Sequence, residues 1–89
     1  MTETDVTGVP RTPADIHAWL VERVALYLKR RAADIDPDLP LTENGLDSVY
    51  AHTLCADIED TLGVYLEPPQ LWDVDTVTKL TAYLADRTD

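Results

Sequence analysis

Apolar residues recur every three or four positions between Thr12 and Arg31, a spacing that predicts an amphipathic helix. Thr12 can cap the start of this helix, and Pro13 suits its first position. We expect Lys29, Arg30 and Arg31 to lie in the last turn, where cations complement the helix dipole. The predicted inward stripe consists of Ile16, Trp19, Leu20, Val24, Tyr27 and Leu28.

A second helical pattern runs from Ser48 to Leu62, with Asp47 as its N-cap and Gly63 as its terminator. At 100° per residue, one side of this helix gathers the apolar residues and should face the core. The predicted inward residues are Ala51, Leu54, Cys55, Ile58 and Leu62.

The connection between these helices, residues 32 to 46, cannot be helical throughout. Pro37 and Pro40 interrupt it, and Gly45 permits a positive φ near its end. The connection is long for a compact bundle, so we expect its apolar residues to hold it against the core. These residues are Ile35, Leu39, Leu41 and Leu46.

The segment after Gly63 is short and irregular, but it contains two further helical signals. Pro68 and Pro69 can start a single turn that carries Leu71 and Trp72 to the core. A last helix should follow Asp75 or Thr76, either of which can cap it, with Val77, Leu80 and Leu84 inward.

These elements predict an all-α fold, because the chain contains no convincing alternating strand pattern. We expect a small antiparallel bundle of three main helices plus a short helical turn, with a long first loop. Residues 1–11 are polar and broken by Gly8 and Pro10, which indicates a flexible tail before a domain at 12–87.

The charge balance limits the partners that this domain can bind. Seven basic and seventeen acidic residues give a net charge of −10, which disfavours nucleic acids and anionic membranes and suits partners with basic patches. No apolar run approaches the roughly 20 residues of a membrane span, and the N-terminus lacks the apolar core of a signal peptide. The lone Cys55 excludes an internal disulfide and fits a reducing cytoplasm, which is the expected location.

Ser48, the only serine, falls in the first turn of the second helix. Free backbone amides and the helix dipole favour an anion there, so its hydroxyl is well placed to carry a phosphate ester. Nucleophilic catalysis by Ser48 is disfavoured because the G-x-S-x-G elbow is absent and His52, four residues on, should not converge on it. We expect no catalytic residues.

A metal site is also disfavoured. Asp34, Asp36 and Asp38 have the first spacings of a calcium loop, but Leu39 and Gly45 replace the glycine and the glutamate that it requires. We therefore expect no metal.

The stretch GLDS, followed by VYAHTLCADIEDTLGV, resembles acyl carrier proteins that depend on phosphopantetheine. IDPDLPLTENGLDS is similar to the loop that leads to their attachment serine, and LWDVDTVTKLTAYL is similar to the closing segment of polyketide-type carriers. The resemblance covers residues 13 to 86, nearly the whole chain apart from its tail.

This resemblance implies that Ser48 takes 4′-phosphopantetheine from coenzyme A, installed by a phosphopantetheinyl transferase. The thiol of that arm would then carry an acyl group as a thioester. Asp47 matches the motif aspartate, which by analogy assists the transferase and its magnesium, in addition to capping the helix. Gly45 matches the motif glycine, whose main role is a backbone turn.

The outward side of the second helix is a candidate docking face, because a small apolar centre with a charged rim is typical of transient interfaces. An ordinary solvated helix face remains the alternative. The residues assigned to the docking face are Val49, His52, Thr53, Ala56, Asp57 and Asp60.

We therefore predict a carrier rather than an enzyme, acting in polyketide, lipopeptide or fatty-acid-type biosynthesis, within secondary metabolism. The implied partners are the transferase, an acyl-loading enzyme (an acyltransferase or acyl-adenylating ligase), and ketosynthase, condensing or tailoring enzymes. We expect a discrete monomer, although a module cut from a longer chain would carry the same pattern. Two alternatives remain: an acidic helical adaptor with no covalent group, and, less favoured, a small thioester hydrolase.

Overall fold

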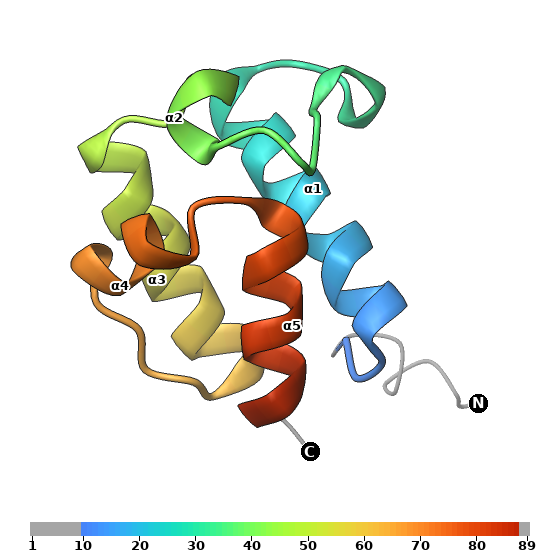
Figure 1. The fold of residues 1–89 in the computed structure, drawn as a ribbon, viewed down its shortest axis with the longest axis vertical. Helices are drawn as coiled ribbons and strands as arrows, with labels where there is room; N and C mark the ends of the chain where they lie inside the picture. The colour runs from blue at the N-terminus through green and yellow to red at the C-terminus, as the bar shows by residue number, and fades with distance from the viewer. Residues whose placement is uncertain (1–9, 88–89) are drawn as a thin grey trace.

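The structure, a computed structural model, describes residues 10–87, which fold into a helical bundle (Figure 1). Its long helices are α1 (Pro13–Leu28), α3 (Ser48–Leu62) and α5 (Val77–Arg87), and the shorter ones are η2 (Ala32–Asp34), α2 (Leu41–Asn44) and α4 (Pro68–Val74). No strand occurs within residues 10–87, where only one bridge pairs Pro40 with Thr76. The all-α fold predicted from the sequence is confirmed, whereas most of the predicted tail, residues 1–9, lies outside the described residues.

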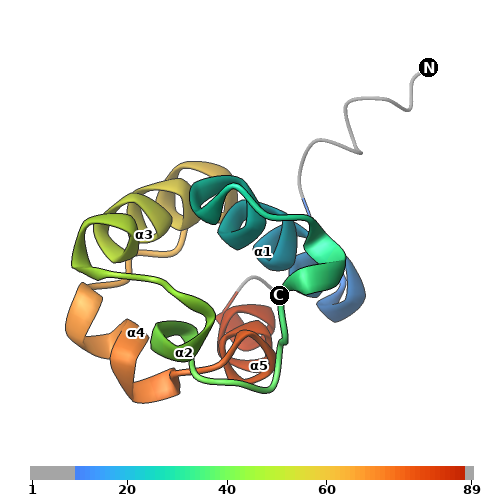
Figure 2. The same ribbon diagram turned by 90° about the horizontal axis from the view of Figure 1, so that it is seen from above.

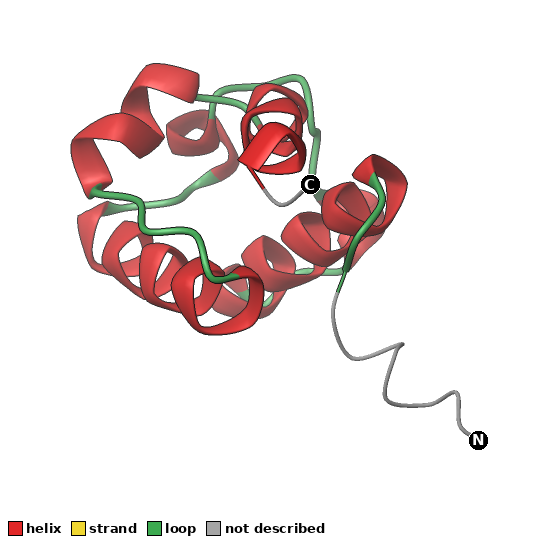
Figure 3. Cartoon of the chain, turned by 90° about the horizontal axis from the view of Figure 1, so that it is seen from below, coloured by secondary structure: helices red, strands yellow, loops and turns green. Residues whose placement is uncertain are grey.

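The helices enclose one core (Figures 2 and 3). α1 packs against α5 and α3, and α4 packs against both α3 and α5. The predicted inward residues of the long helices are buried, apart from partly exposed Trp19, Tyr27, Leu28 and Leu62. The fully buried large side chains are Ile16, Leu20, Leu41, Leu54, Ile58, Leu71, Leu80, Leu84, Val24 and Val77.

α1 begins as predicted and ends earlier than predicted. The Thr12 hydroxyl oxygen accepts a hydrogen bond from the Asp15 amide at 3.1 Å. The helix stops at Leu28 because Lys29 adopts a left-handed conformation (φ 58°), and its amide turns back to the Ala25 and Leu26 carbonyls. The prediction that Lys29, Arg30 and Arg31 occupy the last turn is therefore wrong, since these basic residues follow the helix.

The long first loop contains two short helices, η2 and α2, that the sequence pattern did not predict. Ile35, Leu41 and Leu46 are buried and hold the loop against the core, as expected. Leu39 is 38% exposed, which contradicts its predicted role. Its carbonyl oxygen instead faces the Asn44 side-chain amide at 3.4 Å, and the apolar side chain remains at the surface.

Asn44 organises the interior of this loop. Its side chain is 4% exposed, and its Oδ1 accepts a hydrogen bond from the Asp36 amide at 3.1 Å. Its Nδ2 donates to the carbonyl oxygens of Asp36 at 2.9 Å and Leu39 at 3.4 Å. One buried side chain thus satisfies three backbone groups that the irregular loop leaves without helical partners.

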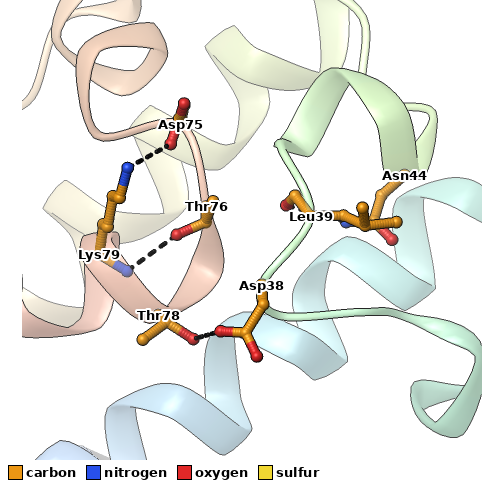
Figure 4. A network of polar contacts seen from close by, with 7 residues as sticks. All are labelled: Asp38, Leu39, Asn44, Asp75, Thr76, Thr78 and Lys79. Atoms are coloured by element: carbon orange, nitrogen blue, oxygen red, sulfur yellow. Dashed lines mark hydrogen bonds and ion pairs between the residues drawn. The ribbon is translucent and has the colours of Figure 1, made fainter.

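The same loop is fastened to the junction between α4 and α5 (Figure 4). The Thr78 hydroxyl donates to Asp38 Oδ1 at 2.8 Å, and the Thr78 amide donates to the Pro37 carbonyl at 3.1 Å. Nearby, the Leu41 amide donates to the Asp75 carbonyl at 2.7 Å. These bonds fix the loop that precedes α3 to elements far from it in the sequence.

Thr76 is the cap of α5, since its Oγ1 accepts a hydrogen bond from the Lys79 amide at 3.1 Å. Of the two predicted candidates, Asp75 instead adopts a left-handed conformation (φ 44°) as the C-cap of α4. Among the described residues, no helix combines the length and apolar character that crossing a membrane requires.

Candidate functional site

Ser48 is the first residue of α3, and it is exposed. Asp47 directly precedes it in an extended conformation (φ −106°, ψ −178°), and its Oδ1 accepts a hydrogen bond from the Tyr50 amide at 3.0 Å. The Asp47 carbonyl accepts the first helical bond, from Ala51, at 2.9 Å. The predicted capping role of Asp47 is therefore confirmed, and the capped helix begins with Ser48 at the surface.

The start of α3 suits an anion attached to Ser48. The first amides of a helix lack partners within the helix and carry the positive end of its dipole. Asp47 satisfies the Tyr50 amide, which leaves the amides of Ser48 and Val49 at the open end of the helix. A phosphodiester on the Ser48 oxygen would lie within this favourable field, so the residues present fit a phosphate-linked arm.

Gly45 ends α2 three residues before Ser48, with φ 113° and ψ 5°. L-amino acids rarely adopt this conformation, so the turn into α3 depends on glycine. A Cβ at this position would lie 3.6 and 3.7 Å from the Leu28 methyl carbons, an ordinary contact distance. The constraint at Gly45 is thus conformational rather than steric.

His52 does not activate the serine hydroxyl in this arrangement. Its Nδ1 lies 2.8 Å from the Ser48 carbonyl oxygen, so this nitrogen contacts the backbone of the serine rather than its hydroxyl. A nucleophilic serine needs a base bonded to its own hydroxyl. Within the described residues, no group of three or more potential metal ligands is present either.

α3 is held in place by a polar and aromatic seam with α1. The rings of Tyr27 and Tyr50 stack with centroids 5.8 Å apart and planes 4° apart. The Tyr27 hydroxyl donates to Asp57, which also lies 3.6 Å from Arg23. Burial, reinforced by the bond to Asp57, raises the pKa of Tyr27, so this hydroxyl stays protonated and remains a donor.

The outward face of α3 carries most of the predicted docking residues. Val49 is 68% exposed, the largest exposed fraction among the exposed large hydrophobic side chains of the described chain. The other exposed members are His52, Thr53, Ala56 and Asp60. Asp57 differs from them, because its carboxylate turns to α1 and pairs with Tyr27 and Arg23. The structure therefore separates Asp57 from the face to which the sequence assigned it.

Two exposed residues near this face were missing from the sequence-based set. Glu59 lines a shallow, open depression together with Ala56 and Asp60. Tyr65 is exposed just beyond the end of α3, with its hydroxyl 3.2 Å from Glu67. The helical projection already placed Glu59 in the acidic rim, although it was not assigned to the docking face, whereas nothing in the irregular segment signalled that Tyr65 would be exposed.

Cys55 is buried on the inner side of α3, as the helical projection predicted. Burial raises the pKa of its thiol, which keeps the group neutral and unreactive. Cys55 therefore acts as a small core residue.

A family model described as "Phosphopantetheine attachment site" matches residues 18–84 of this chain. This match runs from within α1 through most of α5 and includes the Ser48 turn. The chain belongs to the phosphopantetheine-attachment family of carrier proteins. The prosthetic group of this family is a covalently attached phosphopantetheine.

Solved structures of carriers share this fold. A free-standing peptidyl carrier protein from Acinetobacter baumannii is 35% identical, with a TM-score of 0.83, covering 88% of this chain and 98% of that one. The acyl carrier protein LipD from Actinoplanes friuliensis is 44% identical, with a TM-score of 0.73, covering 86% of each chain.

Curated relatives include much longer synthases. A phenolphthiocerol/phthiocerol polyketide synthase of Mycobacterium tuberculosis is 31% identical over 80 residues, which cover 90% of this carrier and 4% of the synthase. The 6-methylsalicylic acid synthase of Penicillium expansum is 31% identical over 84 residues, which cover 90% of this chain and 5% of the synthase. This carrier thus spans only about one-twentieth of the length of these relatives.

Proposed function

We propose that this protein is an acyl carrier that bears 4′-phosphopantetheine on Ser48 and presents thioester-linked intermediates to partner enzymes. The observation that carries the proposal is that Ser48, the chain's only serine, is exposed at the capped N-terminus of α3. A tethered thioester gains from a high effective concentration at each partner site, which a freely diffusing intermediate lacks.

The modification would be catalysed by a phosphopantetheinyl transferase that uses coenzyme A. The Ser48 oxygen attacks the phosphorus on the pantetheine side of the coenzyme A diphosphate, and a base on the transferase removes the hydroxyl proton. The bond to the second phosphate breaks, and adenosine 3′,5′-bisphosphate leaves. We assign Asp47 two roles in this proposal: it caps α3, and its second carboxylate oxygen, which does not accept the Tyr50 amide bond, assists the transferase and its magnesium.

Partner enzymes would recognise the outward face of α3, hereafter the docking face, composed of Val49, His52, Thr53, Ala56 and Asp60. Val49 is exposed beside Ser48, and the acids Glu59 and Asp60 lie toward the C-terminal end of the helix. This arrangement fits a partner that offers an apolar contact and a basic patch. The polyketide-synthase relatives support interaction with synthase enzymes. We further propose loading by an acyltransferase or acyl-adenylating ligase, use by ketosynthase, condensing or tailoring enzymes of a secondary-metabolite pathway, and a cytoplasmic location. Because both acyl and peptidyl carriers share the fold, the acyl assignment rests on the polyketide-synthase relatives.

Intact-mass measurement tests the attachment directly. The purified chain is incubated with a broad-specificity phosphopantetheinyl transferase, magnesium and coenzyme A. We expect one phosphopantetheinyl group to be added to the wild type and none to Ser48→Ala, with the far-UV circular dichroism of both chains unchanged. An unmodified wild type would contradict the proposal and favour an acidic adaptor without a prosthetic group. Thioester hydrolysis by the unmodified chain would instead indicate a hydrolase.

A further inference from the structure

Three basic residues stand together at one end of this acidic molecule. The chain has seven basic and seventeen acidic residues, yet Lys29, Arg30 and Arg31 are consecutive. All three are exposed, and they follow the last residue of α1 directly. Arg31 lies 3.4 Å from Asp34, so part of its charge is already matched by a neighbour.

Among the described residues, Lys29 and Arg30 have no such neighbour. Arg23, Lys79 and Arg87 each approach a carboxylate, at 3.6, 3.4 and 3.7 Å respectively. Within residues 10–87, neither Lys29 nor Arg30 forms an ion pair. Two adjacent cations therefore remain available to an anion from outside the chain.

The position of these cations relative to Ser48 is fixed by the two residues before them. The Tyr27 ring stacks on Tyr50, and the Leu28 methyl groups lie against Gly45. Gly45 and Tyr50 flank Ser48 on either side in the sequence. Lys29 follows immediately, at the end of the bundle where α1 ends and α3 begins (Figure 1).

We propose that Lys29 and Arg30 form an electrostatic contact surface for the phosphates of coenzyme A as it is brought to Ser48. This inference rests on the proposed attachment at that serine. Enzymes that use the loaded arm act at its distal thiol, whereas the transferase must bring the coenzyme A diphosphate to the serine oxygen itself. The anion that must approach this end of the molecule is therefore the donor, with its diphosphate and its 3′-phosphate.

The net charge of −10 would repel that donor, and two unpaired cations nearby offset the repulsion. Their influence extends over roughly 10 Å at 0.1 M salt and shrinks at higher ionic strength. The surface therefore acts on the approach of the carrier to the transferase with its bound coenzyme A, not on the chemical step.

The test uses the double variant Lys29→Asn/Arg30→Gln, because asparagine tolerates the left-handed conformation that Lys29 adopts. Arg11→Gln/Arg87→Gln is the charge-matched control. Both residues are exposed, Arg11 just before the start of α1 and Arg87 at the end of α5, so neither lies at the end of α1 that carries Lys29 and Arg30. Circular dichroism verifies that both variants are folded. Initial rates of modification by a broad-specificity transferase are measured against carrier concentration, with saturating coenzyme A or saturating dephospho-coenzyme A, which lacks the 3′-phosphate.

With coenzyme A at low salt, we expect kcat/KM for the Lys29/Arg30 variant to fall about threefold to tenfold, and the control to stay near wild type. The loss should be smaller with dephospho-coenzyme A, and it should fade as salt rises. Equal losses with both donors would overturn the proposal, because an electrostatic contact with the donor phosphates must weaken when the charge of the 3′-phosphate is removed. An unchanged rate would overturn it too. Failure of the wild type to be modified at all would instead contradict the attachment at Ser48.

Discussion

The stacked rings of Tyr27 and Tyr50, with centroids 5.8 Å apart, join the end of α1 to the first turn of α3. This contact supports the residue two positions after Ser48, and the bond from Tyr27 to Asp57 supports the same helix two turns further on. The orientation of the serine therefore depends on a seam that carries no exposed recognition residue.

Removing the Tyr27 hydroxyl should weaken this seam. Tyr27→Phe keeps the ring stack and removes the bond to Asp57, which should lower the free energy of unfolding by about 1–2 kcal/mol. Urea denaturation measures the loss. Tyr65→Phe is the matched control, because its hydroxyl also bonds a carboxylate but at an exposed site, and it should change stability little. Equal effects of the two variants would contradict the structural role of the seam.

The same hydroxyl predicts a dependence of stability on pH. The folded state raises the pKa of Tyr27 above its unfolded value of about 10, because burial and Asp57 disfavour the phenolate. The unfolded chain therefore loses this proton first, and the stabilisation is present below pH 10 and declines as the pH rises above it. When the free energy of unfolding is measured from about pH 8 to 11, the difference between wild type and Tyr27→Phe should become smaller at the alkaline end. A constant gap would contradict this linkage.

Asn44→Ala should be among the most destabilising substitutions in the first loop. It removes the partners of the Asp36 amide and of the carbonyl oxygens of Asp36 and Leu39 at a buried position. We expect a loss of about 2–4 kcal/mol in the free energy of unfolding, measured by urea denaturation. Thr42→Ala, at an exposed position of the same short helix, should stay within about 0.5 kcal/mol of wild type.

Gly45→Ala should destabilise the chain because its φ of 113° lies where a Cβ is strained. We expect a cost of about 1–3 kcal/mol and slower modification of Ser48, since the turn into α3 must shift. Gly63→Ala is the comparison: its φ of 74° is closer to the ordinary left-handed region, and a Cβ there meets no atom within 4 Å. A larger loss for Gly63→Ala, or an unchanged modification rate for Gly45→Ala, would contradict the importance of this turn.

Val49→Asp separates recognition from folding. Because Val49 is 68% exposed, its replacement should change the free energy of unfolding by less than about 0.5 kcal/mol. The rate of modification by the transferase at low carrier concentration should fall about tenfold if this valine is central to docking. Leu26→Asp, 59% exposed on α1, adds the same charge away from the docking face and should leave the rate near wild type. Equal losses would indicate a general charge effect.

The sequence predicted the long helices well because their signals are local. The stripe of Ile16, Leu20 and Val24 and the caps Thr12 and Asp47 depend only on spacing and on side chains within one turn. The exposed face of α3 followed from the same periodicity, which is why Val49 was placed correctly.

The features that the sequence did not predict depend on contacts between distant segments. Asn44 reads as an ordinary loop residue until Asp36 and Leu39 are folded around it. Asp57 projects near the acidic rim, and only Tyr27, 30 residues away in the sequence, turns it inward. The end of α1 was misplaced because lysine rarely takes the left-handed conformation that Lys29 adopts.

Ser48 belongs to the same continuous α-helix as the exposed residues Val49, Thr53 and Ala56. Helical geometry therefore sets the spacing between the attachment residue and the docking face. Substitutions on the docking face of α3 can change which enzyme binds without moving Ser48. Selection can thus change the partner enzymes of such a carrier while the position of its only serine stays the same.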